Sequence, residues 1–221
     1  MKVVGIIAEY NPFHKGHAYQ IHYAKERLGA DYVIVAMSGP FTQRGTPALF
    51  DKYSRADHAL ACGADLVLEL PVVYATASAQ VFATGGVALL QNTGLVDTLL
   101  FGSECPDLAT LKNIADRLSE ESPAYQALLR QALQEGSSYA SARAKALENP
   151  TYAEILAQPN NILAIEYLGA LSRLGSAMTP LCLQIQGAGY HETSLERDMA
   201  SASGILHFLE DHPHMSDQEL A

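Results

Sequence analysis

Residues 2–17 read KVVGIIAEYNPFHKGH, and this stretch decides the fold. Residues 2–8 form a short apolar run rich in Val and Ile, which ends at a loop containing Pro12 and is typical of a buried parallel strand. From Gly16 to Leu28, apolar residues recur at helical spacing, which predicts a helix. A strand, a turn and a helix in this order form the first half of a βαβ unit.

The same alternation continues along the chain. Further strands are predicted over residues 32–37, 65–70, 96–101 (stopped by Gly102) and 178–186. Helices are predicted over residues 51–62 with Asp51 as cap, 75–91, 107–147 with breaks near Pro123 and Gly136, 160–174 and 201–210. The pattern predicts an α/β fold, a Rossmann-like doubly wound parallel sheet with an added helical segment. We expect an α/β core over residues 1–106, a helical insertion over 107–158 and a return to the core over 159–221.

The chain of 221 residues carries a net charge of −10, and the charge is uneven. Residues 1–150 hold 12 Lys and Arg against 15 Asp and Glu, whereas residues 151–221 hold two against nine. Nucleic-acid binding takes much of its affinity from neutralised phosphates. An RNA partner must therefore meet a local basic patch in the first part, or a region outside this chain.

The three cysteines are far apart, which argues against a disulfide framework or a zinc site and suits a reducing cytoplasm. No apolar run approaches the roughly 20 residues of a membrane span, and the amino end is too quickly acidic for a signal peptide. We therefore expect a cytoplasmic protein with no membrane partner.

The turn after the first strand carries His14, Gly16 and His17. In open α/β sheets, ligands bind where the strands end. Gly16 lets a phosphate approach free backbone N–H groups at the helix start, and the two histidines can donate hydrogen bonds as charge builds in the transition state. Adenylyl transfer from ATP needs this positioning. Ordinary surface histidines are the plain alternative, and a zinc site lacks a third ligand.

Residues 38–47 form a polar, glycine-rich loop that contains Arg44, and Lys52 follows it. Two cations beyond the second strand can neutralise phosphate or hold a carboxylate such as acetate. In the alternative interpretation, Arg44 bridges surface acids and Lys52 is solvated at a helix start.

Six ordered motifs resemble those of the bacterial tRNA(Met) cytidine acetate ligase family, in the superfamily of nucleotidylyltransferases and class I aminoacyl-tRNA synthetases. They are IIAEYNPFHKGH (6–17), SGPFTQRGTPA with FDK (38–52), ELP (69–71), FGSE (101–104), PNNILAIEY (159–167) and GAGYH (187–191). The resemblance implies that ATP, expected with Mg²⁺, activates acetate as acetyl-adenylate. The acetyl group then passes to the wobble cytidine of elongator tRNA(Met), which becomes N4-acetylcytidine.

The resemblance also implies residue roles. Catalysis is assigned to His14, His17, Arg44 and Lys52. Contacts to ATP are assigned to Ile6, Ile7, Ala8, Glu9, Tyr10, Asn11, Pro12, Phe13, His14, Lys15, Gly16, His17, Ala18, Tyr19, Gly102, Asn160 and Ile185. Tyr10 and Phe13 either pack or stack on adenine, and either Asn160 or Asn161 caps a helix.

The sequence departs from the family in its later part. Ile185 stands where the family carries an ATP-contacting arginine, and Leu206 replaces a basic residue of a Ser-rich turn. Glu192 replaces an aspartate, and Arg197 is a candidate substitute for the lost cations. Each lost guanidinium contact is worth about 1.5–3 kcal/mol.

Family chains are also much longer and continue into a helical region implicated in tRNA binding, so this chain is either truncated or naturally short. Two other functions stay open: a nucleotidylyltransferase acting on a small phosphorylated acceptor, and a degenerate relative that binds without turnover.

Overall fold

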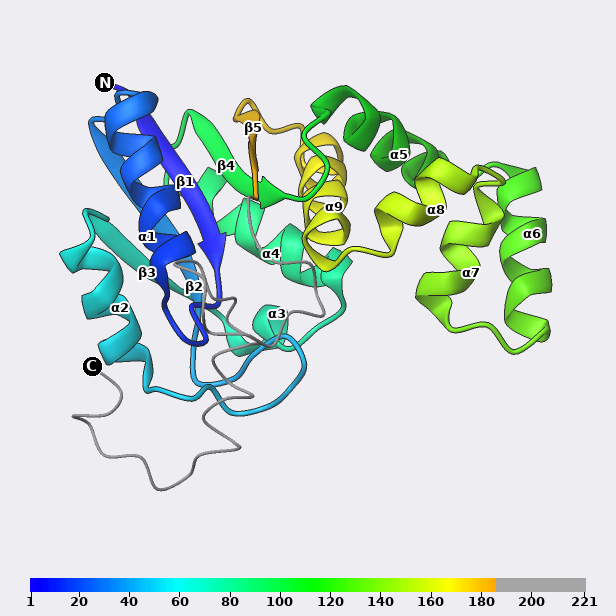
Figure 1. Ribbon diagram of the computed structural model, residues 1–221, viewed down its shortest axis with the longest axis horizontal. Helices are drawn as coiled ribbons and strands as arrows, with labels where there is room; N and C mark the ends of the chain where they lie inside the picture. Colours follow the sequence, from blue (N-terminus) through cyan, green and yellow to red (C-terminus); the bar gives the residue numbers. More distant parts are fainter. Residues whose placement is uncertain (186–221) are drawn as a thin grey trace.

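The computed structural model describes residues 1–185, and in it five parallel strands form one sheet (Figure 1). The strands are β1 (Val3–Ala8), β2 (Tyr32–Ser38), β3 (Leu66–Leu70), β4 (Thr98–Ser103) and β5 (Thr179–Gln184), in the order β3-β2-β1-β4-β5. The chain builds outward from β1 to one side and then returns to build the other side. The order therefore reverses between β1 and β4, and the predicted doubly wound α/β fold is confirmed.

Helices cover both faces of the sheet, and three more project from it as an arm (Figure 1). One face carries α1 (Lys15–His22), the π-helical turn η1 (Tyr23–Arg27) and α2 (Lys52–Ala61). The other carries α3 (Val72–Ala75), α4 (Ala79–Asn92), α5 (Leu108–Glu120) and α9 (Pro159–Arg173). The arm consists of α6 (Pro123–Gln134), α7 (Tyr139–Ala146) and α8 (Pro150–Leu156).

The strands bury alternate residues in two separate cores. In β2, Ile34 and Ala36 pack with the α4–α9 side, whereas Val33 and Val35 pack with α1, η1 and α2. This follows from the period of two along a strand, and it explains why the strands read as unbroken apolar runs. Each fully buried aliphatic side chain stabilises the fold by about 1.5–3 kcal/mol.

Three details differ from the sequence prediction. The helix expected over residues 75–91 begins only at Ala79, where Ser78 caps α4 through the N–H of Val81, and the separate short helix α3 ends at Ala75. Gly102 does not stop β4 but lies within it. The N-cap of α9 is Gln158, so neither Asn160 nor Asn161 caps that helix. Some predictions concern residues outside the described range. They are the helix expected over 201–210 and the roles of Glu192, Arg197 and Leu206.

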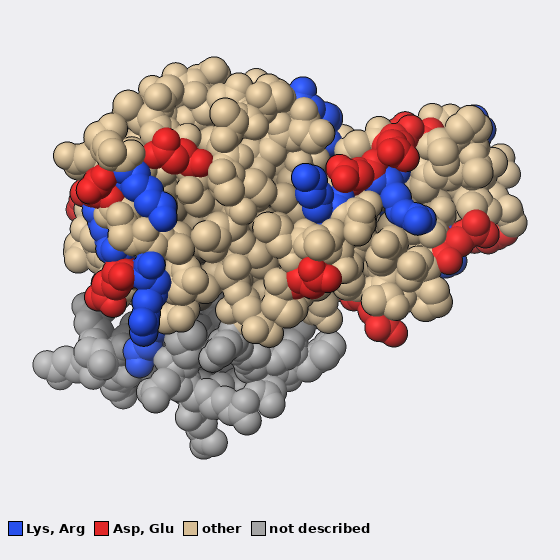
Figure 2. Space-filling model, turned by 90° about the horizontal axis from the view of Figure 1, so that it is seen from above, with Lys and Arg blue, Asp and Glu red and all other residues tan. Residues whose placement is uncertain are grey.

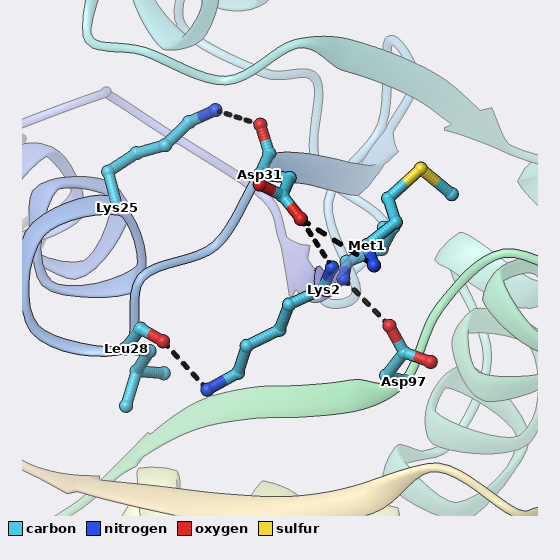
Figure 3. A network of polar contacts seen from close by, with 7 residues as sticks. Met1, Lys2, Lys25, Leu28, Asp31 and Asp97 are labelled. Atoms are coloured by element: carbon cyan, nitrogen blue, oxygen red, sulfur yellow. Dashed lines mark hydrogen bonds and ion pairs between the residues drawn. The ribbon is translucent and has the colours of Figure 1, made fainter.

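Aspartates fix the amino edge of the sheet. An aspartate directly precedes β2, β3 and β4, and each carboxylate accepts a backbone N–H at the start of the neighbouring strand. Figure 3 shows the contacts of Asp31 and Asp97. The pairs are Asp31 with Lys2 (2.7 Å), Asp65 with Val33 (2.7 Å) and Asp97 with Val3 (2.8 Å). These bonds satisfy N–H groups at the strand starts and help to set the register, while the opposite edge carries the motif loops.

A buried ion pair joins the arm to the core. Nη1 of Arg143, on α7, lies 2.7 Å from Oε1 of Glu166, on α9, and the Glu166 side chain is only 4% exposed. Removal of either partner would leave the other charge uncompensated at a largely buried position, which is costly. The pair thus sets where the arm meets the sheet domain.

Candidate functional site

The turn after β1 lies at the point where the strand order reverses, and it is rigidly packed. Tyr10 adopts a positive φ of 52°, and the Asn11–Pro12 peptide bond is cis. The Tyr10 ring is 1% exposed and packs edge-on against Phe13 (4.9 Å between centroids) and His17 (4.8 Å). Tyr10 therefore buttresses His17 and offers no open face for an adenine ring.

His14 and His17 form a reciprocal cap at the start of α1. Nδ1 of His14 accepts the N–H of Gly16 at 3.0 Å, and Nδ1 of His17 accepts the N–H of His14 at 3.3 Å. The rings stack 3.7 Å apart. Since each Nδ1 accepts a hydrogen bond, each ring carries its proton on Nε2. Of the N–H groups at the helix start, that of Gly16 is thus engaged by His14.

Both histidines are held in the neutral form. Burial lowers the pKa of His14 to about 4, and burial together with the neighbouring His14 lowers the pKa of His17 well below its usual range. A neutral imidazole with its proton on Nε2 is a hydrogen-bond donor without a fixed charge. The pair can therefore donate to phosphate oxygens as negative charge develops on them.

The loop of residues 39–50 is attached to this turn. The N–H of Gln43 donates to Oε1 of Glu9 at 2.5 Å, and the N–H of Leu49 donates to Oδ1 of Asn11 at 2.7 Å. Burial raises the pKa of Glu9, although the Gln43 N–H and the nearby charges of Arg44 and Arg55 oppose the shift. Arg44, which is exposed, thus lies close to the turn, as its predicted role requires.

Lys52 is the first residue of α2, and its ammonium group is paired. Nζ lies 2.5 Å from Oε2 of Glu69, and this hydrogen bond raises the pKa of Lys52. The Glu69 carboxylate lies against Gly39, where a Cβ atom would meet its Oε1 at 2.3 Å. Gly39 therefore makes room for the carboxylate that holds Lys52.

Arg55 was missed by sequence reasoning. It is 1% exposed, and its guanidinium donates to the carbonyl oxygens of Phe50 (3.0 Å), Glu9 (2.6 Å), Ser38 (3.1 Å) and Gly39. These carbonyls end β1 and β2 and border the 39–50 loop. The available signal was a cation one turn before Ala59, on the buried face of α2.

At the end of β4 and the start of α9, two more motifs meet. The carboxylate of Glu104 accepts the side-chain N–H of Asn160 (2.8 Å) and the backbone N–H of Asn161 (2.9 Å). Asn161 is buried and accepts from the Ser103 hydroxyl (2.6 Å). Asn161 is thus a structural link, while Asn160 is partly buried beside Glu104, and its contact with ATP stays a prediction.

Gly102 and Ile185 are neighbours. A Cβ atom on Gly102 would lie 2.9 Å from Cδ1 of Ile185, and the Ile185 N–H donates to the Ser103 carbonyl at 2.9 Å. The space left by the glycine is therefore bordered by the isoleucine for which the motif resemblance predicted an arginine.

The remaining predicted ATP-contact residues are spread over β1 and α1. Ile6 is buried in the core below α1, whereas Lys15 and Tyr19 are exposed on the helix. Within residues 1–185, no group of three His, Cys, Asp or Glu side chains is placed to hold a metal ion. In the same range, no helix is long and apolar enough to cross a membrane.

Known proteins match the whole described chain. A tRNA(Met) cytidine acetate ligase from Thermoanaerobacter sp. (strain X514) is 47% identical over 209 residues, covering 93% of this chain and 52% of the relative. The ligase of Clostridium kluyveri is 42% identical over 231 residues, covering 100% of this chain and 57% of the relative. The resemblance inferred from the motifs is thereby confirmed.

Solved structures agree. The apo crystal structure of Thermotoga maritima TmcAL superposes with a TM-score of 0.89 at 40% identity, covering 96% of this chain and 52% of that one. The form bound with alpha-thio ATP gives 0.86 at 39% identity. The chain thus spans about half the length of the relatives it matches. Since the sequence model of the HIGH Nucleotidyl Transferase family also matches residues 1–220, this chain belongs to that family.

Proposed function

We propose that this chain is the nucleotide-binding and acetate-activating part of an ATP-dependent tRNA(Met) cytidine acetate ligase. The observation that carries the proposal is the reciprocal cap of His14 and His17 at the strand-order reversal, with the Arg44 loop attached to it. The names of the relatives, and the alpha-thio ATP bound by the Thermotoga maritima protein, support it.

The proposed first step joins acetate to AMP. A carboxylate oxygen of acetate attacks the α-phosphorus of ATP, the bond to the β-phosphate oxygen breaks, and pyrophosphate leaves. His14 and His17 donate hydrogen bonds to phosphate oxygens as their charge rises, and Arg44 binds the incoming carboxylate. Lys52 must exchange Glu69 for a ligand oxygen if it joins the site. We expect Mg²⁺ to enter with the triphosphate, held mainly by phosphate oxygens and water.

In the second step, the N4 amine of the wobble cytidine attacks the acetyl carbonyl, the bond to the AMP phosphate oxygen breaks, and N4 loses one proton to solvent as AMP leaves. The tRNA must reach the carboxyl edge of the sheet. On the face shown in Figure 2, Lys and Arg form small groups interspersed with Asp and Glu, on the core and on the arm alike. Such a mixed surface supplies few uncompensated cations for phosphates, so we assign most tRNA affinity to the part of the relatives that this chain does not match. This function places the protein in the cytoplasm.

One observation favours a second candidate, a relative that binds ATP without turnover. Ile185 brings a hydrocarbon side chain to Gly102, where the family resemblance places an arginine. Loss of this cation weakens the hold on the triphosphate.

An ATP–pyrophosphate exchange assay on this chain separates the candidates. The ligase function predicts label exchange that depends on acetate. ATP binding without exchange supports the non-catalytic relative, and exchange stimulated by a phosphorylated acceptor, with no effect of acetate, supports a small-molecule nucleotidylyltransferase.

A further inference from the structure

The loop that carries Arg44 is fastened to the nucleotide turn at two points. Glu9 accepts the N–H of Gln43, the residue next to Arg44, and Asn11 accepts the N–H of Leu49 near the other end of the loop. Both acceptors are side chains of the turn, and both donors are backbone groups of the loop. The turn therefore determines where the loop lies.

The loop is also held together by contacts within itself. The Thr42 N–H donates to the Thr46 carbonyl at 2.9 Å, and the two threonine hydroxyls lie 2.8 Å apart. Phe41 and Pro47 form an isolated antiparallel bridge, and Gly45 has a positive φ of 76° in the tight turn between them. The loop is thus a small hairpin that is placed as one unit by its tethers.

Glu9 is itself held firmly. Its carbonyl oxygen accepts Nη1 of the buried Arg55 at 2.6 Å, while its partly buried carboxylate reaches Gln43. The carboxylate also lies within electrostatic range of Arg44. One residue thereby links the end of β1, the hairpin and the cation that the hairpin carries.

We propose that Glu9, with Asn11 as the second tether, is a positioning residue for the acyl substrate. It holds the hairpin so that the Arg44 guanidinium meets the carboxylate of acetate beside the nucleotide turn. This inference rests on the proposed function. Loss of the tether weakens the use of acetate more than the binding of ATP, because the His14 and His17 cap does not depend on it.

A double-mutant cycle tests the positioning role. In acetate-dependent exchange, we expect Arg44→Ala and Glu9→Ala each to raise the KM for acetate by about tenfold or more, and to raise the KM for ATP by a clearly smaller factor. The double variant should be no worse than Arg44→Ala, since Glu9 acts through Arg44. Glu9→Gln keeps an acceptor oxygen and should restore most of the loss. Effects that multiply in the double variant would overturn the proposal.

Hydrogen exchange tests the tether independently of activity. Peptides covering residues 42–49 should exchange faster in Glu9→Ala and in Asn11→Ala than in the parent chain. In these variants, peptides of α6 should exchange as they do in the parent. In the control variant Glu26→Ala, which changes an exposed residue, peptides of the hairpin should exchange as in the parent. If hydrogen exchange of residues 42–49 is the same in these variants as in the parent, Glu9 and Asn11 do not hold the hairpin and the proposal is wrong. If the parent chain shows no acetate-dependent pyrophosphate exchange, the proposed function is wrong and the acetate assignment is wrong with it. If the parent is active but the effects of Glu9→Ala and Arg44→Ala on the KM for acetate multiply in the double variant, only this inference is wrong.

Discussion

Glu104 and Asn160, 56 residues apart in the chain, are joined by a hydrogen bond of 2.8 Å between Oε1 and Nδ2. The other carboxylate oxygen accepts the N–H of Asn161, so Glu104 satisfies the first turn of α9. A carboxylate at this end also faces the positive end of the helix dipole. The motifs FGSE and PNN are therefore one structural unit, which fixes the end of β4 to the start of α9.

Removal of this carboxylate should cost stability and ATP affinity together. We expect Glu104→Ala to lower the free energy of unfolding by about 1–2 kcal/mol through the lost helix cap. Asn160 loses its partner in the same variant, so ATP binding should weaken as well. Urea denaturation and calorimetry measure the two effects. Glu154→Ala, at an exposed position on α8, is the control, and equal stability of the two variants would contradict this role.

Arg55 should be more important for stability than an exposed cation. Its replacement in Arg55→Met leaves four carbonyl oxygens without their donor, and we expect a loss of at least about 3 kcal/mol from charged hydrogen bonds worth 1.5–3 kcal/mol each. Arg55→Lys should recover part of the loss. Urea unfolding gives the values, with the exposed Arg27→Met as control. A loss as small as that of the control would show that the carbonyls find other donors.

The depressed histidine pKa values predict a pH dependence of stability. His14 has a pKa of about 4 in the folded chain against an ordinary value of 6.5, so the unfolded chain binds more protons between these values. Its contribution to stability is therefore complete above pH 6.5 and is lost as the pH falls towards 4. His14→Asn keeps a capping acceptor without the titration, and its denaturation midpoint should fall less steeply with acid. If the denaturation midpoints of the parent and the variant fall equally with decreasing pH, the assignment of a neutral imidazole to His14 is wrong.

The ion pair between Arg143 and Glu166 should show the behaviour of buried charges. Arg143→Met leaves Glu166 uncompensated and is expected to cost about 3–5 kcal/mol. The double variant Arg143→Met/Glu166→Leu should return to within about 1–2 kcal/mol of the parent, because no charge remains buried. Chemical denaturation of the three proteins measures the cycle. A double variant less stable than Arg143→Met would contradict this interpretation.

The alternation of short apolar runs with helical patterns was sufficient to predict a doubly wound parallel sheet, because the central strands β1, β2 and β4 are largely buried and read as apolar runs. The start of α2 was also predictable, since Asp51 caps it through the N–H groups of Tyr53 and Ser54. The later start of α4, at Ala79, was not, because residues 75–91 stay apolar enough to read as one helix. The Tyr74 side chain lies so close to Gly85 that a Cβ atom would not fit there, and the sequence pattern does not report this packing between α3 and α4.

Within the site, the residue types were predictable and their connections were not. His14 and His17 stand out by their place between a strand and a helix. The tethers from Glu9 and Asn11, however, run to backbone N–H groups 34 and 38 residues away, which no side-chain pattern reports. Similarly, the pairing of Lys52 with Glu69 depends on the space left by Gly39.

The central claim is that the turn carrying His14 and His17 stabilises the transfer of AMP from ATP to acetate. The most direct measurement is acetate-dependent ATP–pyrophosphate exchange by the parent chain and by His17→Ala. We expect the parent to exchange label in proportion to acetate occupancy. For His17→Ala, we expect a rate lower by about 100-fold, as for loss of one donor to a developing oxyanion. An unchanged exchange rate in His17→Ala would contradict the claim.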